Sequence, residues 1–221
     1  MRTILAALSV IGLAACSAIP KEHPTFAAPS TDWRRVATSD DRRRLREWRT
    51  AFTKALGQAR KGGHAADIAR EGRLLEPDAA LGPVPIPNGR YKCRAIKLGA
   101  KSPGLLDYIA YPAFDCRIER QGQVQSLTKL SGSQRQVGLL FAADPRRQIF
   151  LGTLVLSDEQ RAMQYGSDPD RDLAGWVERI DDARWRLVLP YPRFESTLDV
   201  IELTPASRAG PSPRRSEHDA P

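Results

Sequence analysis

Pro83-Val84-Pro85-Ile86-Pro87-Asn88-Gly89 separates two parts of this chain whose apolar residues follow different patterns. The alternating prolines exclude a helix there, because proline lacks the backbone N–H and clashes with the preceding turn. Before this segment apolar residues recur at helical spacing, whereas after it short runs with strand character are separated by turn residues. The pattern predicts an α+β protein that is mainly β.

The part before the connector predicts a helical hairpin over residues 38–76. Thr38 or Ser39 is suited to cap its first helix. The apolar residues of that helix recur every three or four positions: Leu45, Trp48, Phe52, Ala55, Leu56 and Ala59. Gly62-Gly63 ends this helix, and a shorter helical pattern follows over residues 65–75.

The part after the connector, residues 89–204, predicts about eight antiparallel strands. The runs are Arg90 to Leu98, Tyr108 to Glu119, Gln123 to Leu130, Arg135 to Ala142, Gln148 to Leu156, Ala174 to Ile180, Arg184 to Leu189 and Leu198 to Leu203. Short turns between neighbours favour an up-and-down order. Strands in this number predict a small barrel that is filled by side chains or holds one small ligand. An open sheet or a sandwich is the alternative.

We expect one globular domain over residues 32–204, which is long enough to bury a single core. Residues 205–221 are rich in Pro, Ser, Ala and Arg, and they predict a disordered tail.

The N-terminus has the layout of a secretory signal, with Arg2 before a short apolar run that ends at a cysteine. Leu13-Ala14-Ala15-Cys16 resembles the lipobox of bacterial lipoproteins, in which the cysteine sulfur takes a diacylglycerol and the signal is cut before it. The resemblance implies a signal peptide over residues 1–15, lipidation of Cys16 and a proline-rich tether over residues 16–31. Ser17 after the cysteine implies the outer membrane, with the domain facing the periplasm. An ordinary secretory signal, which leaves a free periplasmic or secreted protein, is the alternative.

The chain is basic, with a formal net charge of +8. An exported chain does not meet the genome, so we exclude nucleic acid as a partner and expect anionic headgroups or an acidic envelope protein instead. Seven arginines close to the predicted anchor favour such contacts, although they also fit the solvated face of a helix: Arg34, Arg35, Arg42, Arg43, Arg44, Arg46 and Arg49.

Cys93 and Cys116 remain once Cys16 is lipidated. An even pair in an oxidising compartment is normally bonded, and each cysteine lies in a predicted strand among apolar neighbours. We therefore expect a structural disulfide. A metal-binding or redox pair of thiols is the alternative.

The sequence assigns no catalytic, cofactor-binding or metal-binding residue. It lacks a nucleophile elbow, a phosphate loop and a dinucleotide fingerprint. His64 is expected in a solvated turn. Asp168, Asp170 and Asp172 have the spacing of calcium ligands but lack the rest of an EF-hand loop, so we expect a turn in which Arg171 offsets them.

Three strand carboxylates, those of Glu178, Glu195 and Glu202, are candidates for an acid and base pair of the glycosidase kind. Their spacing does not require this chemistry, and we expect solvated faces of strands instead.

Several segments together resemble an uncharacterised family of bacterial envelope proteins defined by a domain of unknown function. Besides the lipobox and the capped, arginine-rich helix, they are Asp32-Trp33, Gly89-Arg90-Tyr91-Lys92-Cys93-Arg94, Lys97-Leu98-Gly99, Phe114-Asp115-Cys116-Arg117-Ile118 and Gly175-Trp176-Val177-Glu178-Arg179-Ile180. The resemblance covers residues 32–205 and implies no catalytic residue.

The leading functional hypothesis is a lipid-anchored binding or interaction module of the bacterial cell envelope. Its expected partners are the membrane, through the anchor, and an envelope protein or a small apolar ligand. The alternative is an envelope hydrolase without a recognisable motif. By architecture alone, the predicted barrel also resembles lipocalin-like inhibitors of secreted proteases, from which the helical hairpin departs.

Overall fold

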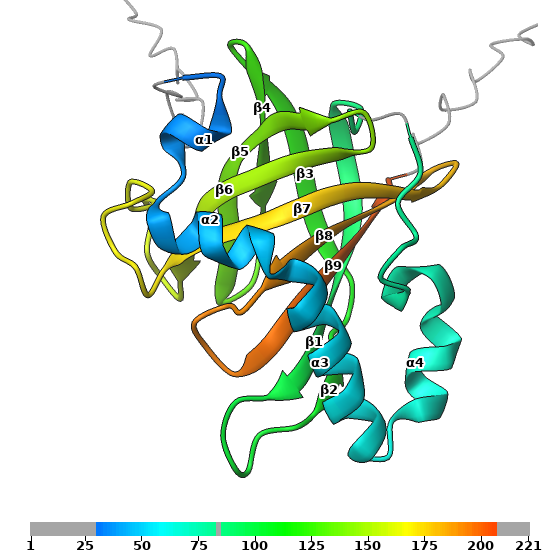
Figure 1. The fold of residues 1–221 in the computed structure, drawn as a ribbon. Coiled ribbons are helices and arrows are strands. Elements are labelled where there is room, and N and C mark those ends of the chain that lie inside the picture. The colour runs from blue at the N-terminus through cyan, green and yellow to red at the C-terminus, as the bar shows by residue number, and fades with distance from the viewer. Residues whose placement is uncertain (1–29, 83–84, 207–221) are drawn as a thin grey trace, which may run out of the picture.

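The computed structural model of this protein describes residues 30–82 and 85–206 (Figure 1). The predicted signal peptide, Cys16 and nearly all of the predicted tail lie outside the described residues. The helices come first along the chain: α1 (Trp33–Val36), α2 (Ser39–Arg46), α3 (Trp48–Lys61), α4 (Ala65–Glu71) and the short 3-10 helix η1 (Gly72–Leu75).

The strands follow the connector and confirm the mainly β fold. They are β1 (Gly89–Ala100), β2 (Tyr108–Ala110), β3 (Phe114–Gln121), β4 (Val124–Lys129), β5 (Gln134–Asp144), β6 (Arg147–Leu156), β7 (Asp172–Asp181), β8 (Arg184–Pro190) and β9 (Ser196–Pro205). Each predicted run corresponds to one strand, apart from residues 108–119, which include β2 and most of β3.

Pro112 lies in the gap between β2 and β3, where a residue without an N–H cannot continue the ladder. β2 pairs with residues 96–98 of β1, whereas β3 pairs with residues 89–93 of the same strand. The two short strands therefore share one position in the sheet.

β1 also pairs with β9, and this pairing closes the sheet into a barrel. The antiparallel register runs from Tyr91 opposite Pro205 to Ala100 opposite Ser196. The remaining strands from β3 to β9 pair with their neighbours in sequence, so the barrel is up-and-down, and the open sheet and the sandwich are excluded. Pro205, which we placed in the tail, is the last residue of β9.

One end of the barrel is plugged by Ile86, which belongs to the connector and is fully buried in the interior apolar cluster. Its backbone N–H donates to Oε1 of Gln148 at 3.1 Å, and its carbonyl accepts from Nε2 of Gln125 at 2.8 Å. The buried backbone N–H and carbonyl of Ile86 have no contact with water, and these two hydrogen bonds satisfy them instead.

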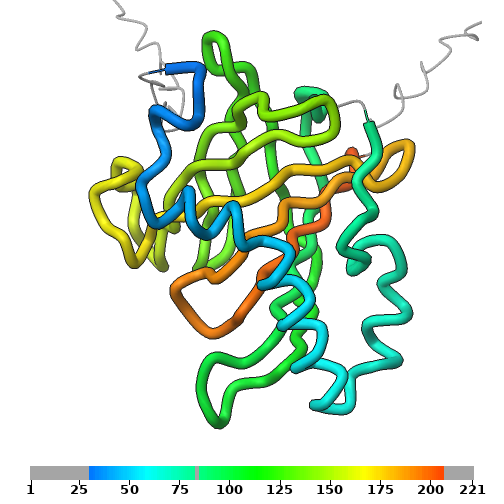
Figure 2. Tube along the Cα trace, in the orientation of Figure 1, coloured from blue at the N-terminus to red at the C-terminus, as the bar shows by residue number. Residues whose placement is uncertain are grey.

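The other end of the barrel carries the longer connections. The loop between β1 and β2 and the loop between β8 and β9 lie side by side there, green and orange in Figure 2. The N–H of Lys101 in the first loop donates to the carbonyl of Glu195 in the second at 2.9 Å.

The helices cover one side of the outer barrel surface (Figure 1). α3 packs on β1, β8 and β9, while α2 contacts β7 and α1 contacts β5. The predicted first helix is therefore divided into α2 and α3, with a bend at Glu47 (φ −88°, ψ 7°). The bend keeps the hydrogen bond from the Glu47 N–H to the Arg43 carbonyl, so the helical layer follows the curved sheet without leaving that donor unpaired.

A row of charges of alternating sign crosses the outer face of five neighbouring strands beneath this layer. This charge ladder consists of Arg147, Glu178, Arg186, Glu202 and Arg94, each directly opposite the next in the register of β6, β7, β8, β9 and β1. Arg147 and Arg186 pair with Glu178 at 2.7 and 2.6 Å, and Arg94 pairs with Glu202 at 2.9 Å. The ladder continues into α4, where Glu71 also pairs with Arg94.

Arg186 joins the charge ladder to the backbone of the helical part. Its side chain is completely buried, as is that of Glu178. Its guanidinium donates to the carbonyls of Leu74, Glu76 and Pro77 at 2.8, 2.7 and 3.0 Å. Glu178 and Glu202 were expected on solvated strand faces. This expectation is wrong, because Glu178 is fully buried and Glu202 is 14% exposed, and each carboxylate is held between two arginines.

The predicted disulfide joins Cys93 of β1 to Cys116 of β3. Both cysteines are buried in the interior cluster, beside Tyr91, Ile118 and Leu203. Because Tyr91 is the register partner of Cys116, the bond connects diagonal neighbours on one face of adjacent strands.

Replacing both cysteines by alanine should lower the free energy of unfolding by roughly 3 kcal/mol, because the bond closes a loop of 23 residues in the unfolded chain. Urea unfolding measures the change, and far-UV circular dichroism should retain the strand signal. Two titratable thiols in protein alkylated at lysis under non-reducing conditions would contradict the bond.

Glu178→Gln should lower the free energy of unfolding by about 3–5 kcal/mol, because it leaves the Arg186 charge buried without a counter-charge. Glu119→Gln is the matched control, since Glu119 forms an exposed pair with Arg117 and its loss should have a far smaller effect. Equal unfolding midpoints for the two variants in urea would show that the charge ladder does not hold the helical layer in place.

Candidate functional site

A cavity of about 450 Å³ opens at the end of the barrel opposite Ile86. We call it the barrel mouth. It is lined by the ends of several strands and by the loops that join them: Ala95, Lys97, Tyr111, Pro112, Phe114, Lys129, Ser131, Gly132, Ser133, Gln134, Gln136, Glu195, Asp199 and Ile201. Inward-facing positions alternate with outward ones along each strand, so polar residues at inward positions near the strand ends project into this space.

A buried ion pair forms one wall of the barrel mouth. Lys97 of β1 lies opposite Asp199 of β9, with Nζ 3.3 Å from the Asp199 carboxylate and 3.0 Å from that of Glu195. Burial opposes the charge on Lys97, but Asp199 and Glu195 outweigh burial and raise its pKa. The hydroxyl of Ser196 donates to Asp199. The groups on this wall are thus paired with one another.

Lys129 on the opposite wall is a cation without such a partner. Its Nζ lies 4.0 Å from the centroid of the Phe114 ring, and among the described residues no carboxylate forms an ion pair with it. Burial lowers the pKa of the Lys129 ammonium below its usual value, and the charges of Lys97 and Arg135 lower it further. This wall therefore has a cationic group available to a ligand.

Gln136 supplies a second polar group without a partner. Its side chain is 7% exposed, and its Oε1 is buried without a hydrogen bond to any described residue. Leaving such an acceptor unpaired costs about 1–3 kcal/mol. Thr128 pairs with Val137, so the adjoining Lys129 and Gln136 lie at the same level on neighbouring strands, and both line the cavity.

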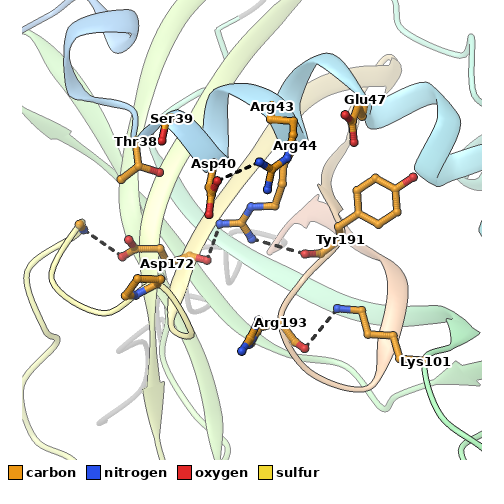
Figure 3. A pocket seen from close by; sticks show the side chains of 12 residues that line it. Thr38, Ser39, Asp40, Arg43, Arg44, Glu47, Lys101, Asp172, Tyr191 and Arg193 are labelled. Carbon is orange, nitrogen blue, oxygen red and sulfur yellow. Dashed lines mark hydrogen bonds and ion pairs between the residues drawn. The ribbon is translucent and has the colours of Figure 1, made fainter.

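A second cavity, of about 510 Å³, lies outside the barrel between α2 and the loops that follow β6 and β8. Figure 3 shows Arg44 reaching across it, where the guanidinium donates to the Asp172 carbonyl at 2.9 Å. The other arginines at this groove also have partners, because Arg43 pairs with Asp40 at 3.1 Å and Arg193 with Asp170 at 2.7 Å. Because these cations are already satisfied by the protein, the smaller barrel mouth is the better candidate for a ligand site.

The acidic loop before β7 uses its carboxylates locally. Asp168 accepts the N–H of Asp170 and pairs with Arg171, and Asp172 accepts the N–H of Gly166. Within residues 30–82 and 85–206 no group of three or more His, Cys, Asp or Glu side chains is arranged to hold a metal ion.

The other chemically suggestive residues lie apart from one another. His64 is outside the barrel, where Nδ1 is 2.8 Å from Asp67 and the ring stacks on Tyr108. Glu178 and Glu202 belong to the charge ladder on the outer face, whereas Glu195 lies at the barrel mouth. The structure does not bring the three glutamates together as a pair of catalytic carboxylates.

Sequence reasoning missed Lys97, Lys129 and Gln136 as site residues. The sequence did contain a signal for these three residues. Each lies two positions from an apolar or small residue that faces the barrel interior, as Lys129 does from Leu127, and therefore faces the interior as well. When polar residues occupy the inward positions of a predicted barrel, they indicate either a water-filled interior or a ligand site.

The described part of the chain contains no helix that is both long and apolar enough to span a bilayer.

Comparison with protein families identifies one match, which extends over residues 33–203 and is described as a domain of unknown function (DUF4893). Searches among curated proteins and among solved structures found no match. The resemblance to a family of this kind is thus confirmed at that level. Because the match spans well over half of the chain, the protein belongs to the DUF4893 family, which is defined by a domain of unknown function.

Proposed function

We propose that this protein is a lipid-anchored binding module of the bacterial cell envelope that holds a small ligand in the barrel mouth. The supporting observation is a cavity of about 450 Å³ lined by two polar side chains that lack partners among the described residues: Gln136 Oε1 has no hydrogen bond and Lys129 has no ion pair. The cavity volume is in the range of about 300–1,000 Å³ that small-molecule sites occupy.

The construction of the barrel also supports binding. Ile86 plugs one end and the interior cluster fills the middle, so the described residues leave the barrel mouth as the opening for a ligand. The disulfide between β1 and β3 fixes two strands that line the cavity. A rigid and largely preformed site loses little conformational entropy when the ligand binds.

The anchor part of the proposal depends on the N-terminal sequence. Cys16 ends an apolar run of signal-peptide length and follows small residues, as in the lipobox of bacterial lipoproteins. Several acyl chains on one residue give stable anchoring, and residues 17–29 are long enough to hold the domain away from the membrane surface. The proposed location is the outer membrane, with the domain facing the periplasm.

A bulky side chain at the cavity floor tests the ligand proposal. Native mass spectrometry of protein isolated from its own envelope should show a small bound molecule, and Ala95→Phe should lose it because the ring fills the cavity. Ala110→Phe is the matched control, since Ala110 is exposed on β2 outside the cavity and the variant should retain the molecule. The same occupancy in both variants, or no bound molecule in the wild-type protein, would contradict ligand binding at the barrel mouth.

Cys16→Ser tests the anchor. The variant should take up no fatty-acid analogue in metabolic labelling and should leave the detergent fraction, whereas Ser17→Ala should be labelled like the wild-type chain. A wild-type chain that takes up no label and fractionates as soluble would show that Cys16 is incidental and that the protein is free in the periplasm or secreted.

A further inference from the structure

We infer that the barrel mouth takes an amphiphilic organic acid, whose carboxylate pairs with Lys129 and whose neighbouring hydroxyl or amide N–H donates to Gln136. This inference rests on the proposed function and names the chemical class of the ligand.

The charged residues that line the cavity are two lysines and two carboxylates, and both carboxylates pair with the same lysine. Lys97 and Lys129 both line the cavity, but Glu195 and Asp199 both pair with Lys97. Among the described residues that line the cavity, Lys129 is thus the cation that remains for a ligand. Its partial burial strengthens a pairing with a carboxylate, because a counter-charge meets less competition from water there.

Lys129 and Gln136 together define the polar end of the ligand. They lie next to one another across β4 and β5, where directly opposite side chains have Cβ atoms about 5 Å apart. A carboxylate has only acceptors, so it satisfies Lys129 but not the buried oxygen of Gln136. Satisfying this oxygen requires the Gln136 amide to turn Oε1 toward the cavity and the ligand to carry a donor close to its carboxylate.

Part of the remaining wall of the cavity is apolar. Ala95, Phe114 and Ile201 line it next to the interior cluster, and Tyr111 lies at the rim with 38% of its surface exposed. These side chains fit an alkyl or aromatic body. A molecule without one would leave this surface in contact with water.

The test uses the full chain carrying Cys16→Ser, which needs no detergent, and isothermal titration calorimetry with four probes of equal chain length. The probes are 3-hydroxydecanoate, decanoate, 1,3-decanediol and decyltrimethylammonium. We expect 3-hydroxydecanoate to bind best, decanoate and the neutral diol about tenfold more weakly, and the cation not at all.

Variants assign each contact to its residue. Lys129→Met should weaken 3-hydroxydecanoate at least tenfold and leave the diol unchanged, while Lys129→Arg should largely restore binding. Gln136→Leu should reduce 3-hydroxydecanoate to the affinity of decanoate. Lys54→Met is the matched control, because Lys54 is exposed on α3 and the same loss of charge there should have no effect. Thermal unfolding identifies any variant that fails to fold. The comparison of the four probes uses the chain with an unaltered cavity, so it remains valid even if a variant does not fold.

The outcomes distinguish the ligand class from binding itself. Equal binding of anion and cation, unchanged affinity in Lys129→Met, or no binding of any probe to the chain overturns the inference about the ligand class. If a bound molecule nevertheless disappears from the Ala95→Phe variant in native mass spectrometry, the barrel mouth remains a binding site for another class of molecule. If that molecule is also absent from the wild-type protein, the proposed function fails as well.

Discussion

The buried pair of Arg186 and Glu178 is the interaction on which the arrangement of this protein depends. An unpaired charge at either position would be costly beneath the helical layer, because neither side chain reaches water. The protein satisfies Arg186 with one carboxylate and with carbonyls of residues 74, 76 and 77. The guanidinium thereby acts as a capping group for η1 and fixes the chain that leads from the helices into the connector.

The position of the connector has a consequence at the far end of the barrel. The segment held by Arg186 continues past Leu81, whose N–H donates to the Arg179 carbonyl of β7 at 2.7 Å, and reaches Ile86 in the barrel interior. One opening is closed in this way by the chain itself. The opposite opening, where the longer loops lie, remains a cavity, and the distinction between a plugged and an open end follows from where the helical part is attached.

The two ends also differ in how their inward polar groups are satisfied. At the plugged end Gln125 and Gln148 both bind the backbone of Ile86. At the barrel mouth Gln136 has the same side-chain chemistry and a comparable burial, yet no described residue pairs with its oxygen. Natural proteins leave few buried polar atoms unpaired, and exceptions concentrate at functional sites. This contrast within one molecule is why we propose the barrel mouth as the ligand site rather than the larger groove beside α2, whose arginines and Lys101 are bonded to other groups of the protein.

The sequence by itself determined the elements and the disulfide, and only the tertiary structure decided closure and the site. The alternation of apolar residues and the turn residues located the strands, because both patterns extend over only a few positions. The even number of remaining cysteines and their apolar neighbours predicted the bond between Cys93 and Cys116. The pairing of β1 with β9 joins residues that lie far apart in the sequence, from Tyr91 opposite Pro205 to Ala100 opposite Ser196, which no local pattern encodes. For the same reason Glu178 looked like a solvated strand residue until the helical layer was placed over it. Lys129 and Gln136 became candidate site residues only when closure turned one face of the sheet into an interior, because the role of an inward polar side chain depends on what lies opposite it.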